Sequence, residues 1–489
     1  MQAIAFASAP FVELSDIQKA GFSSRRACRK AFYNKTRLLY DFDVETDKLT
    51  IVQAVLLLAY WSEKPGDNKG AYYWTGIAIA LVQTLGLHRK GEYNNQLQET
   101  KLLKRVWWSC YVRDRMLGLA MGRPLRIQDT ELDTPPLTLQ DFDIISTSDE
   151  SNAMIPSTND QIALAEIFIS MVEVWNMGGR VLSLHFSVLQ AECNTSTAKG
   201  DDGSSATMLF LKSTPSDPAL VQLYDDQLQT FYSTLPTSCS HSFSLDQNIT
   251  SSSVSTNAGY LHIVFWSVVS ALHRPQLRSW DKALSLKRVE EAAIEVARVD
   301  RKLYELGRDR YLPATAAIPF QITAFIIHTK RLQYKKTDDV AEVLESLFFC
   351  VKVIEKGREA FPGGDDSVDF LQFIAFTANV TLLFDSQSRL WGVEYGGVHV
   401  CPGSRQVSQD SNLSQRGLGD ALPEAVSSDA IFASHLQTPD TAGATESIDP
   451  KAFSFDDVDA VNWDSLADFL PGCSVDYDFS SPTANVNFT

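Results

Sequence analysis

The cysteines are the residues whose spacing could most directly do chemistry, because closely spaced thiolates bind zinc. The chain contains seven of them, Cys28, Cys110, Cys193, Cys239, Cys350, Cys401 and Cys473. No two lie within four residues of each other, so the chain has no ligand pair of the kind that structural zinc sites use. The odd number and wide spacing favour reduced thiols over a disulfide framework. We therefore expect no metal site in these residues.

Sequence patterns that carry catalysis are also missing. The chain has no G-x-S-x-G nucleophile elbow, no H-E-x-x-H zinc motif, and no glycine-rich phosphate loop. The acidic pairs Asp225-Asp226 and Asp456-Asp457 are not part of a longer aspartate-rich magnesium motif, and the eight histidines do not pair at ligand spacing. We therefore expect no catalytic residues and no enzymatic activity.

One carboxylate, Asp114, falls on the apolar face of the helix predicted for residues 99–121. Burying a lone charge there would be costly, so Asp114 needs a partner. Its sequence neighbours Arg113 and Arg115 are expected to point elsewhere, which leaves Arg123 as the candidate. We predict a structural ion pair between Asp114 and Arg123, with a ligand contact as the alternative.

Two histidine–arginine pairs stand at the predicted ends of helices, His88-Arg89 and His273-Arg274, the second followed by Pro275. Cations interact favourably with the carbonyl end of a helix, and a proline prevents its continuation. This structural explanation suffices, and a ligand-sensing histidine is the alternative.

Two other groups also have a structural and a functional interpretation. Trp74, Trp107 and Trp108 recur at helical spacing, which is typical of core packing, although tryptophans also line ligand pockets. The basic hexad, residues 25–30 (Arg-Arg-Ala-Cys-Arg-Lys), has the composition of a nuclear-import signal or a nucleic-acid contact. A solvated helix face explains the hexad equally well.

The charge of the chain is unevenly distributed. The net charge is −17, which disfavours a protein that grips a polyanion over its whole surface. Residues 401–489 contain 14 acidic and 3 basic side chains, so most of the excess charge belongs to the tail. The longest apolar run, residues 49–61, is too short to span a bilayer, and we expect no membrane partner.

The hydrophobic pattern predicts an all-α body. Apolar residues recur at helical spacing in segment after segment, and few segments alternate with the period of a strand. Gly86 follows one of these segments as a plausible C-terminal glycine. Helices are predicted at about 26–42, 49–61, 71–87, 99–121, 160–193, 218–235, 258–278, 283–306, 314–334, 338–360 and 367–386.

Composition divides the chain into four parts. Residues 1–25 are expected to be a clipped or flexible N-terminus, and residues 26–390 a helical domain interrupted by Ser/Thr-rich loops at 194–217 and 237–257. Residues 391–450, poor in aromatics beyond their first few positions, are expected to be a disordered linker. Residues 451–489 form an acidic tail in which aromatic residues return.

The acidic tail contains a candidate activation segment at residues 453–470. Large apolar side chains stand there among five aspartates, and repulsion between the carboxylates should keep them accessible to a partner groove. The alternative is a C-terminal helix docked on the body. The candidate contact residues are Phe455, Trp463, Leu466, Phe469 and Leu470.

Several blocks of the chain resemble, in the same order, the middle regulatory region of fungal zinc-cluster transcription factors, in the branch of the cutinase-gene activators. The resemblance covers roughly residues 26–280 and extends more thinly to about 390. The blocks are Ala31-Phe32-Tyr33-Asn34-Lys35, Leu38-Leu39-Tyr40-Asp41, residues 52–58, Trp74-Thr75-Gly76, Leu85-Gly86-Leu87-His88-Arg89, Arg105-Val106-Trp107-Trp108, Asp114-Arg115, Gly122-Arg123-Pro124 and residues 129–135.

The resemblance implies an all-helical regulatory domain of a nuclear transcription factor that controls RNA polymerase II genes and works with co-activator proteins. Full-length members bind zinc through an N-terminal cluster of six cysteines that reads DNA, and the ligands of that cluster are not among these residues. No DNA-binding residue can therefore be identified. The chain is expected to act either as the regulatory and activation part of such a factor or as a co-regulator of another DNA-bound factor, and less readily as a helical enzyme or scaffold.

Overall fold

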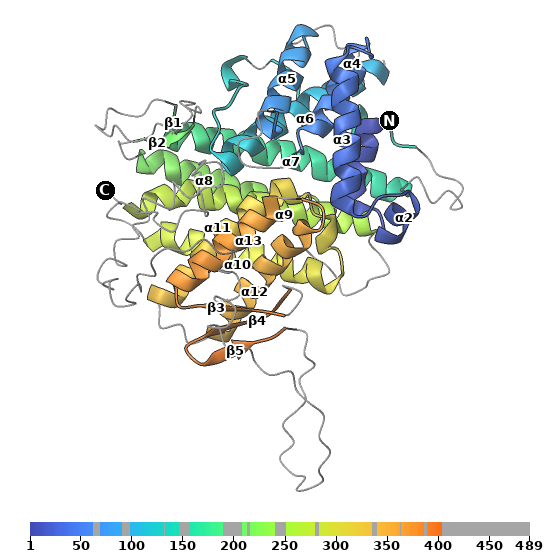
Figure 1. Ribbon diagram of the computed structural model, residues 1–489. Helices are drawn as coiled ribbons and strands as arrows, with labels where there is room; N and C mark the ends of the chain where they lie inside the picture. The colour runs from blue at the N-terminus through green and yellow to red at the C-terminus, as the bar shows by residue number, and fades with distance from the viewer. Residues whose placement is uncertain are drawn as a thin grey trace, which may run out of the picture. The chain divides into compact units, whose positions relative to one another are not determined.

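The computed structural model describes residues 1–61, 69–89, 98–131, 133–145, 156–188, 208–212, 216–239, 251–278, 283–334, 340–361, 363–385 and 389–402. Within these ranges the protein is mostly helical, with thirteen α-helices, five short 3₁₀ helices (η1–η5) and five short strands (Figure 1). The helical body therefore agrees with the sequence pattern, whereas the strands do not.

The first group of helices surrounds an aromatic core. Trp61, Trp74 and Trp107 are fully buried there, and Tyr33 stacks on Trp61 with ring centroids 3.9 Å apart. Trp108 belongs to the same core, so these tryptophans do pack in the interior. The helices are α1 (Gln2–Ser8), α2 (Leu14–Lys19), α3 (Arg25–Asp41), α4 (Lys48–Leu58), α5 (Ala71–Thr84) and α6 (Gln98–Met121).

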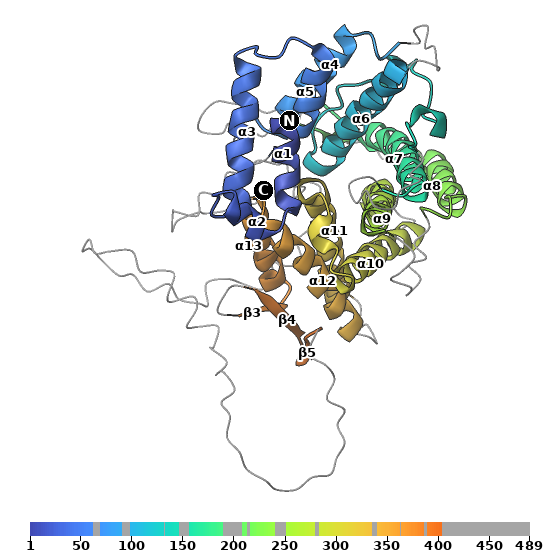
Figure 2. The same cartoon turned by 90° about the vertical axis from the view of Figure 1, so that its right-hand side faces the viewer.

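The second group of helices packs around α9, nearly all of whose residues are buried. Its neighbours α7, α8, α10 and α11 cover it from several sides, and α12 and α13 complete the group (Figure 2). The helices are α7 (Thr158–His185), α8 (Pro218–Ser233), α9 (Ser252–His273), α10 (Ala283–Glu305), α11 (Ala314–Tyr334), α12 (Val340–Arg358) and α13 (Gly363–Thr377).

Helices α6 and α7 belong to both cores. On α6, Trp107 faces the aromatic core, whereas Met116 and Leu119 face the core around α9. On α7, Val172 contacts the first core and Trp175 the second. The two hydrophobic cores are thus joined through a shared pair of helices.

Local sequence explains where several helices begin and end. Side chains at the position before the helix accept backbone N–H groups of the first turn, which stabilises that turn. Gly86 adopts a left-handed conformation, φ +74°, just after α5, as expected for a glycine that ends a helix. The N-cap residues are Ser24 before α3, Asp47 before α4, Ser157 before α7, Asp217 before α8 and Ser251 before α9.

Two small antiparallel sheets correct the all-α expectation. Strands β1 (Phe186–Ser187) and β2 (Phe210–Leu211) pair where a continuous helix and a loop were predicted. Strands β3 (Thr381–Phe384), β4 (Leu390–Tyr395) and β5 (Val398–Val400) form a second sheet in the order β3-β4-β5. The last helix consequently ends at Thr377, and the ordered body continues past the predicted limit of 390.

The N-terminal segment is helical, which differs from the expectation of a flexible stretch. Residues 1–25 contain α1, η1 (Ala9–Phe11) and α2, and α1 packs against α3 and α4. Phe6 is fully buried, with its ring 6.0 Å from that of Trp61. The segment is therefore part of the first core. Its single apolar turns are too short to show a helical period in sequence.

Helix α7 is the one described helix long and apolar enough to cross a membrane by length and composition. Half of its apolar window is buried inside the protein, and it packs against α6, α8 and α9. Its burial between two cores accounts for its apolar composition without a bilayer.

Candidate functional site: the charged cluster on helix α6

Asp114 and Arg115 form the centre of a buried charged cluster on α6. Their side chains are paired, with 2.9 Å between Arg115 Nη1 and Asp114 Oδ2, and both are almost wholly buried. Arg115 Nη2 also lies 2.6 Å from an oxygen of Asp129, in η2 (Asp129–Glu131), and the same oxygen accepts the Tyr111 hydroxyl. The Arg115 guanidinium covers the Tyr111 ring at 3.7 Å. The cluster therefore ties η2 to α6.

The loop after α6 is held by its backbone. The N–H groups of Arg126 and Ile127 donate to Asp114, each at 3.1 Å. The Arg126 guanidinium then lies over the Tyr72 ring, 3.9 Å from its centroid. A Cβ at Gly76 would lie 2.9 Å from the guanidinium carbon of Arg126. Glycine at this position therefore permits the close approach of α5 and the loop.

The charged groups of this cluster stabilise one another and have a structural role. Burial raises the pKa of Asp114, and Arg115 together with the two backbone N–H groups opposes that rise by stabilising the charged form. The donors from Arg115, Arg126 and Ile127 occupy the carboxylate oxygens. Asp114 thus accepts hydrogen bonds from donors of the protein itself and holds the Arg115 side chain and the loop backbone in place.

The expectation that Arg115 points away from Asp114 is wrong. Helical geometry separates the two Cα–Cβ directions by about 100°. The arginine side chain is nevertheless long enough to bend toward Asp114, and the pairing is favourable because both groups are buried. Arg123 has its guanidinium 5.5 Å from the Tyr72 ring centroid, and its pairing with Asp114 stays a prediction.

A second buried pair fastens the segment that follows. Lys104 Nζ lies 2.7 Å from Asp141 Oδ2, with both side chains about 5% exposed. Arg105 pairs with Asp143 at 3.0 Å, and the Trp108 indole donates to the backbone oxygen of Pro135. The block Arg105–Trp108 therefore positions the chain between α6 and α7. The lysine pair was missed because its partner is 37 residues away.

The basic hexad joins α3 to the end of α12 and the start of α13. Arg25 pairs with Glu359 at 3.0 Å, and Arg26 pairs with Asp365 at 2.8 Å and also donates to the backbone oxygen of Arg358. Figure 2 shows the lower end of α3 beside α13. Arg25 and Arg26 therefore contact residues at the end of α12 and the start of α13, and the function of the hexad as an import signal or nucleic-acid contact stays a prediction.

Arg29, the next arginine of the hexad, is 1% exposed. Its guanidinium donates to the backbone oxygen of Tyr60 and lies 4.2 Å from the ring centroid of Phe361, with Phe6 and Trp61 also adjacent. Burial lowers its pKa to about 9. Arg29 therefore replaces a carboxylate partner with aromatic faces.

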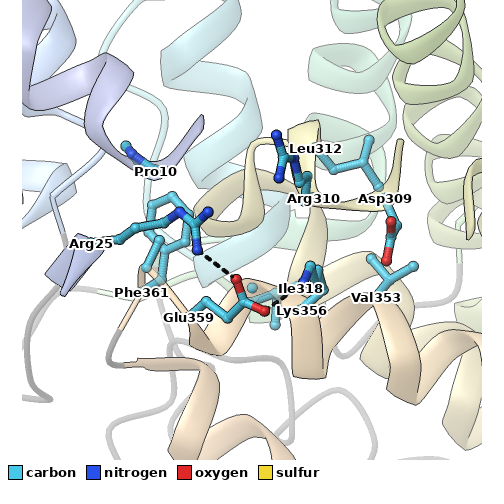
Figure 3. Close-up of a pocket in the computed structure, with 12 residues that line it drawn as sticks. Pro10, Arg25, Asp309, Arg310, Leu312, Ile318, Val353, Lys356, Glu359 and Phe361 are labelled. Atoms are coloured by element: carbon cyan, nitrogen blue, oxygen red, sulfur yellow. Dashed lines mark hydrogen bonds and ion pairs between the residues drawn. The ribbon is translucent and has the colours of Figure 1, made fainter. Parts of the chain in front are cut away.

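A small cavity lies beside these contacts (Figure 3). It encloses about 20 Å³ and is lined by Arg25, Glu359 and Phe361 together with Asp309 and Lys356. Glu359 bridges Arg25 and Lys356. This space holds about one water molecule, so the junction is an internal contact, not a ligand site.

The histidines of the two predicted pairs lie near helix ends, as expected. His273 is the last residue of α9 and is fully buried. Its ring contacts Asp225 Oδ1 at 3.2 Å and Ser285 Oγ at 3.1 Å, and Arg288 pairs with the other oxygen of Asp225 at 3.0 Å. His88 lies in the turn after α5. The His273 network links α8, α9 and α10 and has a structural role.

No group of three or more histidine, cysteine, aspartate or glutamate side chains is placed to hold a metal ion within the described ranges. The predicted activation contacts Phe455, Trp463, Leu466, Phe469 and Leu470 lie outside those ranges. The candidate site residues that the structure describes are therefore those of the cluster on α6 and of the hexad.

Comparison with known proteins gives a consistent set of relatives. Residues 3–197 match the fungal specific transcription factor domain. Cutinase transcription factor 1 beta of Fusarium vanettenii is 33% identical over 392 residues, 76% of this chain and 44% of that protein. A transcription factor of Fusarium pseudograminearum (strain CS3096) is 28% identical over 404 residues, 78% and 44% of the two chains.

Transcription factor cpaR of Aspergillus oryzae is 26% identical over 400 residues, 76% of this chain and 64% of that protein. The chain thus spans between about two fifths and two thirds of the length of these relatives. No solved structure matches it. The domain match begins in α1 and the relatives align over three quarters of the chain, so this protein carries the fungal specific transcription factor domain, and its homologues are fungal transcription factors.

Proposed function

We propose that this chain supplies the regulatory and activation parts of a nuclear transcription factor acting on RNA polymerase II genes in a fungus. The observation that carries the proposal is the combination of the fungal transcription factor domain at residues 3–197 with an acidic tail of 14 acidic and 3 basic residues. The domain provides a helical regulatory body, and the tail provides the partner-binding segment.

The activation function resides in residues 453–470. Trp463, Leu466 and Leu470 fall at helical spacing, i, i+3 and i+7, with Phe455 and Phe469 nearby. Such a segment is too short to be stable as an isolated helix and folds when a groove accepts its apolar face. The surrounding aspartates select a groove with a basic rim. The partners are therefore co-activator proteins.

DNA recognition requires residues other than these 489. The sequence holds no closely spaced cysteine pair, so a family zinc cluster would have to lie outside it. The alternative is a co-regulator or an interfering partner that acts through another DNA-bound factor. Both versions assign the same activation role to the tail and differ in how the chain reaches a promoter.

The test is a reporter assay with the tail fused to a heterologous DNA-binding domain. Residues 445–489 should activate the reporter, and Trp463→Ala combined with Phe469→Ala should abolish the activity. Phe488→Ala, an aromatic change outside the acidic cluster, is the matched control and should leave activation intact.

A silent wild-type fusion would contradict the proposal. If deletion of residues 453–470 also lowers the melting temperature of the full chain, the segment is instead a helix docked on the body. Detection of the full chain in the nucleus by fluorescence microscopy tests the localisation separately.

A further inference from the structure

Asp300 of α10 is a fully buried carboxyl group among the helices that pack around α9. It accepts the side-chain amide of Gln321 on α11, with 3.1 Å between Nε2 and Oδ1. Gln321 is also fully buried, and the thiol of Cys350 on α12 contacts the same carboxyl. Three helices therefore meet at one polar contact inside an otherwise apolar core.

Two oxygen atoms at this contact have no donor. Asp300 Oδ2 and Gln321 Oε1 are both buried, and neither has a hydrogen-bond partner in the described part of the chain. A buried polar atom left unsatisfied is destabilising. When Asp300 is ionised both oxygens are acceptors, so neither can satisfy the other. One proton on Oδ2 supplies the donor that both lack.

A negative charge on Asp300 would have no cationic partner, because none of the described lysines and arginines bonds to it. The ionisable groups that act on it are the Cys350 thiol and the carboxyl of Asp309 in η5 (Asp309–Tyr311). Burial, and to a smaller extent Asp309, raise the pKa of Asp300 well above its usual value, against the opposing hydrogen bond from Gln321. An isolated buried charge is costly, so the neutral acid is the favoured form. The buried ionisable side chains of α9 and α11 bond to other residues; they are Tyr260, His262, His273 and His328.

We propose that Asp300 and Gln321 form a neutral acid–amide pair that makes the stability of the helical body sensitive to pH. The Oδ2–H group of Asp300 donates to Gln321 Oε1, while Gln321 Nε2 donates to Asp300 Oδ1, so the two planar groups exchange two hydrogen bonds. Ionisation removes the Oδ2 proton and leaves a buried charge facing the amide oxygen, which weakens the contact between α10 and α11. The pair is thus closed at low pH and opens as the pH rises.

Proton binding by the unfolded chain determines the direction of the effect. The unfolded chain loses the proton of Asp300 near the ordinary aspartate pKa of about 3.9, whereas the folded protein retains it to a higher pH. Between these two pKa values unfolding releases a proton, so the stability contributed by the neutral pair is fully present below the unfolded pKa and is lost as the pH rises through the folded pKa. Within this window each pH unit lowers the contribution of Asp300 to the folding equilibrium constant about tenfold.

The test is urea denaturation of the full chain and of Asp300→Asn at pH 5, 6 and 7. Asparagine offers the donor and the acceptor of the neutral acid but cannot ionise. Relative to the parent, the folding equilibrium constant of Asp300→Asn should rise about tenfold per pH unit, because its unfolding releases no proton at this position. The other titrating groups are common to both proteins. Asp133→Asn, at an exposed aspartate after η2, is the matched control and should keep the pH dependence of the parent.

Infrared spectroscopy at pH 6 tests the pair directly, because the carbonyl stretch of a neutral carboxylic acid is distinct from that of a carboxylate. The parent should show a neutral carboxyl band that Asp300→Asn lacks. Gln321→Met, which removes both hydrogen bonds of the acid, should move this band to higher frequency, and this result decides the matter if Asp300→Asn does not fold. The proposal is overturned if parent and Asp300→Asn share one pH dependence. It is equally overturned if the parent has no neutral carboxyl band or if Gln321→Met leaves the band in place.

Discussion

Replacing Asp114 by alanine should destabilise the protein strongly, because one carboxylate satisfies three buried donors. The change would remove the acceptor of the Arg115 guanidinium and of the backbone N–H groups of Arg126 and Ile127. Arg115 would keep its contact with Asp129, whose side chain is 45% exposed. The guanidinium would thus stay partly paired, whereas the Ile127 N–H would lose its buried acceptor.

The magnitude follows from these losses. Removing one partner of a buried ion pair costs about 3–5 kcal/mol, and the remaining Asp129 contact places the expected value near the lower end, about 3 kcal/mol. Asp114→Asn should cost less, about 1–2 kcal/mol. Its carbonyl oxygen can occupy the Oδ2 position and accept from Arg115 and Ile127 without the negative charge, whereas its NH2 group at the Oδ1 position cannot accept the Arg126 N–H.

The assay is urea denaturation of the parent and the two variants at pH 7, with the free energy of unfolding obtained by linear extrapolation. Asp133→Ala, an exposed aspartate in the segment after η2, is the matched control and should change stability by less than about 0.5 kcal/mol. An Asp114→Ala variant as stable as the control would refute the assignment of Asp114 to a buried structural pair.

Three other outcomes are expected. Burial lowers the pKa of His328 to about 3, so the folded protein favours the neutral ring and its free energy of unfolding falls as the pH drops below about 6.5. His328→Gln should therefore reduce the loss of that free energy between pH 7 and 5 by about 2 kcal/mol, measured by urea denaturation at each pH, and an unchanged loss would contradict this. Arg29→Ala should lower the free energy of unfolding by about 3 kcal/mol or more, because it removes a buried side chain from among three aromatic rings. Arg26→Ala, at a partly exposed position, should lower it by about 1 kcal/mol or less, and equal losses in thermal melts would contradict the buried role of Arg29. Dialysed chain should contain no stoichiometric zinc by metal analysis and show no sequence-selective DNA binding in gel shifts at physiological salt.

The helices could be predicted from sequence because their signal is long and repeated. The segment 314–334 was predicted with the limits that the structure shows, since about six turns of apolar periodicity identify a helix. Strands β1 and β2, two residues each, carry no comparable periodicity. Their pairing depends on the contact between distant segments, which sequence spacing does not reveal.

The charged contacts were harder to predict for a related reason. Helical periodicity placed Asp114 on a buried face, but it describes only where a side chain starts, and Arg115 reaches its partner by bending back. Lys104 and Asp141 meet across 37 residues of chain, and Arg26 and Asp365 across 339. Pairs of this kind are determined by how helices pack, which local patterns do not encode.

The end of the matched domain at residue 197 does not coincide with a structural boundary. Helix α7 lies inside the matched range, yet its Trp175 belongs to the core around α9, with its ring 6.4 Å from that of Phe320 on α11. Arg25 and Arg26 of α3 bond to residues of the chain between 358 and 365. Since both cores share α6 and α7, residues beyond 197 bury surface that the matched domain would otherwise expose. The helices therefore pack as one body that extends to the sheet at 381–400, and we expect a change in either core to act on the other through these two helices.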